Sequence, residues 1–188
     1  MKRDRSIIKG AATGLIAGVV ASLVMNKFQS ALSELVNGQS KSHGAQSQQS
    51  GSPGHGAGAF LKKLNAEDAN DDAAERTANV VAAAVLNKRL SKQEKDLGGT
   101  IFHYAFGASA GAFYGAASEV VPQIRSGVGL PFGFAVWLLA DEFVVPALGL
   151  WKSAAEYPPS IHGYALASHL VYGLTTEVTH RLVHFAWP

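Results

Sequence analysis

Four stretches of the chain, each 20 to 24 residues long, contain almost no charged side chains. They cover residues 7–26, 98–121, 128–150 and 161–183. An α-helix rises about 1.5 Å per residue, so about 20 apolar residues cross the hydrocarbon core of a bilayer. The four stretches contain six charged residues in total: Lys9, Glu119, Asp141, Glu142, Glu177 and Arg181. We therefore predict four transmembrane helices.

The composition of the chain agrees with a membrane protein. Charged residues make up 16% of the sequence and apolar residues 47%, whereas a typical soluble domain has roughly 25% charged residues. The net charge of +2 is too small to indicate a nucleic-acid partner. The chain has no cysteine, which excludes disulfides and zinc–thiolate sites. The alternative fold is a soluble bundle of Ala- and Gly-rich helices, because the mean hydropathy is only +0.09.

The predicted fold class is an all-α, polytopic membrane protein with four transmembrane helices and one extramembrane amphipathic helix. Residues 1–28 form an N-terminal tail and the first transmembrane helix, for which a cleaved signal peptide is the alternative. Residues 29–97 form an extramembrane loop, and residues 98–188 contain the other three helices. Within the loop, residues 38–58 are rich in Gly, Ser and Gln and predict a flexible tether with two isolated histidines, His43 and His55.

The second half of the loop predicts helical structure. Residues 66–90 are acidic at the start and basic at the end, which matches the helix dipole. The apolar part of this helix is too short to cross a bilayer, so we expect it to lie at the interface or against the bundle. Ser91 and Glu94 have the spacing of a capping box, which predicts that a helix begins at Lys92 and continues into the second span.

The basic residues near the spans predict the orientation, since short cytoplasmic flanks carry an excess of Lys and Arg. Arg125 lies in the short turn at 122–127, and Arg181 lies at the end of the fourth span. Three more basic residues precede the first span: Lys2, Arg3 and Arg5. Only Lys152 opposes this pattern. We expect an inner-membrane, multi-pass protein with both termini in the cytoplasm.

Glycines at four-residue spacing mark two helix faces for close packing. In the first span they are Gly10, Gly14 and Gly18, and in the second span they are Gly107, Gly111 and Gly115. In lipid, helices associate through close backbone contact, which such small-residue ridges permit. The presence of two such ridges among four predicted helices favours packing within one chain, with a homo-oligomer as the alternative and the lipid bilayer as the other partner.

The candidate intramembrane polar site consists of ionisable residues within the spans, which usually face the protein interior because a charge in lipid is costly. On the fourth span, His162, His169 and His180 share one face of the helix. Asp141 and Glu142 point about 100° apart unless the helix is distorted, for example by Pro146. The complete candidate set is His103, Glu119, Asp141, Glu142, His169, Glu177 and His180.

Several chemical interpretations of this set stay open. The groups could fix the packing by hydrogen bonds across helices, conduct protons or ions, or bind a transition metal through Glu177 and His180. His103 and His169 could also be axial haem ligands. No cofactor is predicted outright. The sequence has no hydrolase or nucleotide-binding signature, and this favours a non-enzymatic structural or assembly component. Proton or metal-ion handling is the alternative.

The region from Leu90 to Arg181 resembles the YagU-like family of small bacterial inner-membrane proteins, a family of unknown function. The similarity is carried by Leu90-Ser91 with KQEK, HYAFGASAGAFYGAASE from His103 to Glu119, Val121-Pro122-x-Ile124, Pro146-x-x-Gly149-Leu150, Ser168-His169, Glu177 and the earlier GLIAG at Gly14–Gly18. This resemblance implies a multispanning bacterial inner-membrane protein, and it implies no specific reaction.

Overall fold

The computed structural model describes residues 6–37, 73–148 and 159–187. Within these residues all regular structure is helical and no strand is found. The described elements are α1 (Ile7–Asn37), α3 (Ala73–Leu86), α4 (Lys92–Val120), the 3-10 turn η2 (Pro122–Arg125), α5 (Leu130–Val136), the π-helical segment η3 (Trp137–Val144), α6 (Val145–Ala147) and α7 (Pro159–Ala186). The predicted tether at 38–58 and the basic residues at 2–5 lie outside the described residues.

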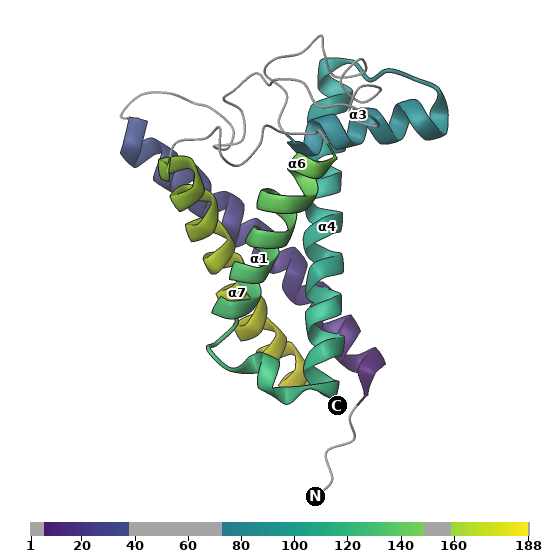
Figure 1. Ribbon diagram of the computed structural model, residues 1–188. Coiled ribbons are helices and arrows are strands. Elements are labelled where there is room, and N and C mark those ends of the chain that lie inside the picture. Colours follow the sequence, from purple (N-terminus) through teal and green to yellow (C-terminus); the bar gives the residue numbers. More distant parts are fainter. Residues whose placement is uncertain (1–5, 38–72, 149–158, 188) are drawn as a thin grey trace, which may run out of the picture.

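Four helical rods form the bundle. They are α1, α4, α7 and the rod made of α5, η3 and α6, while α3 lies beside the first turns of α4 (Figure 1). Helix α1 packs against both α4 and α7, and α5 packs against α7. The start of α1 and the end of α7 lie at the same end of the bundle, where the Lys9 ammonium donates a hydrogen bond to the Trp187 carbonyl oxygen at 2.5 Å. We call this the terminal end, and the opposite end the α3 end.

The helix boundaries extend the predicted spans. The stretches 7–26 and 161–183 lie entirely within α1 and α7, and the described residues of the other two lie mostly within α4 and the rod from α5 to α6. Helix α4 begins at Lys92 behind a complete capping box of Ser91 and Glu94. Two helical regions, Ile7–Leu32 and Leu130–Ala147, are long and apolar enough to cross a membrane by length and composition, with mean hydropathies of 1.9 and 1.5. The structure therefore supports two candidate spans directly, and the count of four remains a proposal.

The two predicted glycine ridges face each other within one chain. Gly10 lies against Gly115, Gly14 against Gly111 and Gly18 against Gly107, as expected for antiparallel helices in close contact. A Cβ atom added to Gly111 would come within 2.7 Å of the Gly18 Cα atom. Because each of these positions touches the backbone of the other helix, any larger residue would push α1 and α4 apart.

A second glycine contact joins the start of α5 to α7. Gly129 precedes α5 in the left-handed conformation, with φ of +81°, and it lies against the backbone of Gly173. Gly133 lies against the backbone of His169 and Gly173. The sequence pattern does not predict this contact, because Gly129 and Gly133 form only one small-residue step on a short helix.

The interior of the bundle contains mainly small and polar residues, whereas large apolar residues lie on its surface. Among the described residues, the buried apolar ones are four alanines, Met25, Tyr114 and Tyr172, whereas thirteen buried residues are polar or charged. Large apolar side chains lie on the outside, for example Phe113, which is 73% exposed, and Phe185, which is 92% exposed. Soluble domains show the opposite arrangement, with large apolar residues inside and charged residues outside.

Candidate functional site

Glu177 on α7 is a buried carboxylate with three partners. It is completely buried, and its Oε2 atom accepts a hydrogen bond of 2.7 Å from the Tyr114 hydroxyl. Its Oε1 atom pairs with the Nε atom of Arg125 at 3.1 Å and also with Arg181. A buried charge of this kind is tolerated only when it is paired and hydrogen-bonded. Three partners therefore occupy Glu177, which leaves little of this carboxylate for a metal ion.

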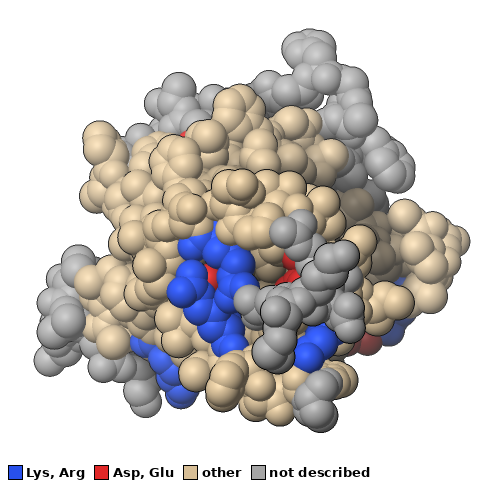
Figure 2. Space-filling model, turned by 90° about the horizontal axis from the view of Figure 1, so that it is seen from below, with Lys and Arg blue, Asp and Glu red and all other residues tan. Residues whose placement is uncertain are grey.

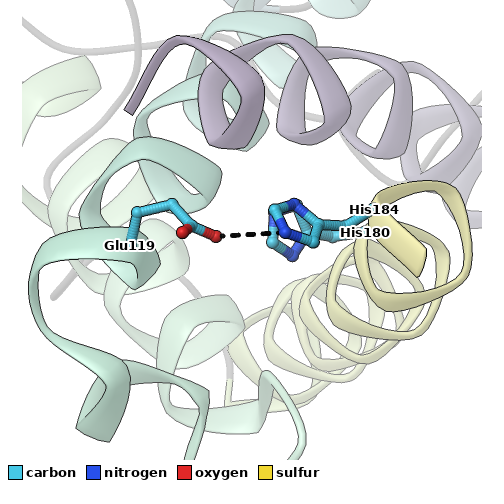
Figure 3. Close-up of side chains that lie close together, drawn as sticks. All are labelled: Glu119, His180 and His184. Atoms are coloured by element: carbon cyan, nitrogen blue, oxygen red, sulfur yellow. Dashed lines mark ion pairs between the residues drawn. The ribbon is translucent and has the colours of Figure 1, made fainter. Parts of the chain in front are cut away.

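Glu119, His180 and His184 form a second buried group at the terminal end. Glu119 lies in the last turns of α4, while His180 and His184 lie one helical turn apart on α7. The Nε2 atom of His184 is 3.6 Å from Oε1 of Glu119. The rings of His180 and His184 have centroids 5.5 Å apart. Figure 3 shows the Glu119 carboxylate pointing across from α4 toward the two imidazoles on α7.

His180 has an unusual environment within this group. Its side chain is fully buried, and neither ring nitrogen has a hydrogen-bond partner among the described residues. Its nearest aromatic neighbour besides His184 is Tyr114, at 6.1 Å between ring centroids in an edge-on arrangement. Buried polar atoms almost always have partners, so an imidazole with none among the described residues is uncommon.

Two further acid–histidine pairs lie toward the α3 end. Oε1 of Glu142 is 2.6 Å from Nδ1 of His162, and Oδ2 of Asp141 is 3.6 Å from Nδ1 of His169. The neighbouring acids thus face two histidines that are two turns apart on α7, and not one common site. The helix carrying the acids is π-helical at this point and leads directly to Pro146, which lacks a backbone N–H.

The predicted polar set therefore divides into separate groups. His169 and Glu177 are eight residues apart on α7, which separates them by about 12 Å along the helix. Tyr172 lies between them, and its hydroxyl donates a hydrogen bond of 2.6 Å to the Gly107 carbonyl. His103 lies on α4, with its ring packed edge-on against Tyr104 at 5.6 Å. Sixteen residues of α4 separate His103 from Glu119, which places them about 24 Å apart along the helix.

Five residues that contact the predicted set were not members of it: His162, Tyr114, Arg125, Arg181 and His184. His184 lies one residue beyond the predicted end of the fourth span, although the spacing His180-x-x-x-His184 places both rings on one helix face. This spacing could have identified His184 as a site residue from the sequence. Tyr114 and Arg125 had no such signal, because their role depends on how α4, η2 and α7 meet in space.

The terminal end also carries a group of basic side chains. Seen from this end, Figure 2 shows Lys and Arg atoms gathered near the middle of the face, with acidic atoms beside them and uncharged surface around them. The elements that end or turn here contain Arg125 and Arg181, which share Glu177. The Arg181 guanidinium also donates a hydrogen bond to the Arg125 carbonyl at 3.3 Å.

Comparison with known proteins gives one match. Residues 79–178 match the profile of the family described as a protein of unknown function, DUF1440. This region contains α4, the rod from α5 to α6 and most of α7. No curated protein matches the chain. No solved structure matches it either. Since the matched region covers more than half of the sequence, the chain belongs to the DUF1440 family of proteins of unknown function.

Proposed function

We propose that this protein is a multi-pass integral membrane protein, a non-enzymatic structural component built around the tightly packed helix pair α1 and α4. The proposal includes four spans, both termini on the cytoplasmic side, and a bacterial inner membrane, in line with the resemblance to the YagU-like family. The single observation that carries it is the reversed polarity of the bundle, in which polar side chains are buried and large apolar side chains are exposed.

The energetics of the exposed residues explain why this observation favours a bilayer. Exposing a large apolar side chain to water costs about 1.5–3 kcal/mol relative to burying it. The rod from Leu130 to Ala147 is apolar, yet only 6% of its residues are buried within the chain. Many such side chains on one surface would make a soluble monomer aggregate. In a bilayer the same surface faces lipid tails.

The charge distribution supports the proposed orientation. Arg125 and Arg181 lie at the terminal end, and Lys9 lies there as well. The positive-inside rule places such an end on the cytoplasmic side. The α3 end, with the extramembrane helix α3, would then face the opposite compartment.

Cysteine labelling tests this topology, because the natural chain has no cysteine. Gln93→Cys and Ser126→Cys place single thiols at exposed positions at either end of α4. In oriented membrane vesicles, a membrane-impermeant maleimide should label the two variants from opposite sides. Labelling of both from the same side would contradict the proposal, as would release of the wild-type protein from membranes by alkaline carbonate.

Ion handling is a second candidate function, favoured by the partly buried pairs Asp141–His169 and Glu142–His162. Ionisable groups inside a membrane commonly mark proton or ion paths. Proteoliposomes containing a pH-sensitive dye provide the test. Ion handling predicts a proton flux that His169→Ala abolishes, whereas a structural component predicts the flux of empty liposomes for both proteins.

A further inference from the structure

We propose that Glu119, His180 and His184 form a binding site for one divalent transition-metal ion of the Zn²⁺ type. The site would join the last turns of α4 to the last turns of α7 at the terminal end of the bundle. It goes beyond the proposed membrane function and does not depend on it, because all three residues lie within one chain, on helices α4 and α7.

The geometry of the three side chains suits a shared ion. One ligand atom from each residue lies within 4.8 Å of the corresponding atoms of the other two. Zn²⁺ binds imidazole nitrogen and carboxylate oxygen at about 2.0–2.2 Å, so tetrahedral ligands lie about 3.4 Å apart. The Glu119–His184 separation of 3.6 Å is already close to this value. Small side-chain rotations would bring the third ligand to the same distance.

The burial of the group adds an independent argument. All three side chains are buried, and both nitrogens of His180 lack a hydrogen-bond partner among the described residues. A fully buried imidazole without a partner is costly. A metal bond would satisfy one nitrogen of His180 and would explain why this side chain points into the group.

The nearby arginines pair with another carboxylate, Glu177. Arg125 and Arg181 both pair with Glu177, so their charge is partly compensated one turn away from the histidines. The Glu119 carboxylate remains available to balance a cation. Gly10 of α1 makes room for it, since a Cβ atom at this position would come within 2.6 Å of the Glu119 Cγ atom.

The donor set indicates the class of metal. Two imidazoles and one carboxylate suit Zn²⁺, Fe²⁺, Mn²⁺ or Co²⁺, whereas Mg²⁺ and Ca²⁺ prefer sites made only of oxygen ligands. Three protein ligands leave at least one coordination position open, as in sites that bind water or exchange their metal. His180-x-x-x-His184 supplies two ligands from one rigid helix, which limits the rearrangement that binding requires.

Metal titration of the purified full-length protein tests the proposal. The protein is stripped with a chelator and titrated with Co²⁺, whose visible absorption reports bound nitrogen ligands, and then with Zn²⁺ by calorimetry. The expected result is one ion per chain, displacement of Co²⁺ by Zn²⁺, and no comparable binding of Mg²⁺ or Ca²⁺. The expected affinity loss is at least about tenfold in each of His180→Ala, His184→Ala and Glu119→Gln.

Matched variants control for folding and for other histidines. His169→Ala removes another buried histidine of the same helix and should bind like the wild type. A double variant, His43→Ala with His55→Ala, removes the histidines of the predicted tether and should also bind like the wild type. Glu119→Gln keeps the size of the side chain, so circular dichroism and elution volume should match the wild type while the metal affinity falls.

Three results would overturn the proposal. The first is a wild-type protein that binds no Co²⁺ or Zn²⁺. The second is unchanged binding in the folded Glu119→Gln and His184→Ala variants. The third is loss of binding in the tether variant, which would identify an adventitious site there. None of these results bears on the membrane topology, which the cysteine labelling tests separately.

Discussion

At the scale of single residues, Tyr114 shows how the bundle tolerates a buried carboxylate. Its side chain is almost completely buried between α4 and α7, and its hydroxyl donates a hydrogen bond of 2.7 Å to the Glu177 carboxylate. Since a hydrogen bond to a charged group contributes about 1.5–3 kcal/mol, Tyr114→Phe should lower the free energy of unfolding by that amount. Unfolding of the detergent-solubilised protein, followed by circular dichroism, measures it.

Tyr104 provides the matched control for this prediction. Its hydroxyl accepts a hydrogen bond of 3.1 Å from the Asn26 amide, a neutral and only partly buried interaction. Tyr104→Phe should therefore cost less, about 0.5–1.5 kcal/mol. Equal losses in the two variants would show that the charge of Glu177 is not what makes the Tyr114 contact strong.

Glu94 predicts a pH dependence outside the proposed membrane region. Hydrogen bonds from the Lys88 ammonium and from Ser91 lower the pKa of Glu94 from 4.5 to about 2. A carboxyl group whose pKa is lowered by folding stabilises the protein above its unfolded pKa. Its contribution should thus be complete above pH 4.5 and disappear as the pH falls toward 2. Hydrogen exchange of the first amides of α4 measures this loss.

The control for the capping box is Glu94→Gln, which cannot ionise. Amide protection in the first turn of α4 should then be lower and should not change between pH 4.5 and 2 on account of this side chain. Because the Lys88–Glu94 pair is exposed, high salt should weaken the pH effect in the wild type. A wild type and variant with the same pH profile would contradict the prediction.

The sequence predicts some residues of the site and not others. The sequence identifies Glu119, His180 and Glu177 as candidates because charged and ionisable groups are rare within apolar stretches. It could not assign them to different groups, since this depends on Tyr114 and Arg125, which reach Glu177 from other elements. The same restriction to apolar stretches excluded His184.

At the scale of helices, the glycine contact between α1 and α4 predicts opposite effects for two similar substitutions. A Cβ atom at Gly111 would overlap the backbone of α1, whereas a Cβ atom at Gly163 on α7 would meet no atom within 4 Å. Gly111→Ala should therefore cost about 1–3 kcal/mol of unfolding free energy. Gly163→Ala should stabilise the helix by up to about 1 kcal/mol, because alanine has the higher helix propensity.

Thermal unfolding of the two alanine variants in the same detergent measures this difference. The contact model requires Gly111→Ala to unfold at a lower temperature than the wild type and Gly163→Ala to unfold at the same or a higher temperature. Equal midpoints for all three proteins would mean that α1 and α4 are not in close backbone contact.

The helices were more predictable than their pairing. Apolar length and the Ser91–Glu94 spacing are local properties, so they locate α1, α4 and α7 well. The partner of a glycine ridge is not a local property. Residue spacing shows that a face is suited to close contact, but the choice between a second helix of the chain and a second subunit depends on the three-dimensional arrangement. In the structure the partner is within the chain.

At the scale of the whole molecule, the proposed topology requires the bilayer as the solvent of the apolar surface. Two helical regions meet the length and hydropathy requirements for a span, whereas α4 and α7 carry the buried polar residues that lower their average hydropathy. Helix α4 is therefore the most informative place to probe, because the two-span and four-span arrangements place its apolar side chains in different solvents.

The most direct measurement is the labelling rate of Phe113→Cys on α4, a position with 73% of its side chain exposed. In intact vesicles, a membrane-impermeant maleimide should leave this thiol unlabelled from either side, while Ser126→Cys is labelled rapidly from one side. Adding detergent and denaturant should make the two rates similar. Rapid labelling of Phe113→Cys in intact vesicles would show that water, and not lipid, covers this helix, and would contradict the account.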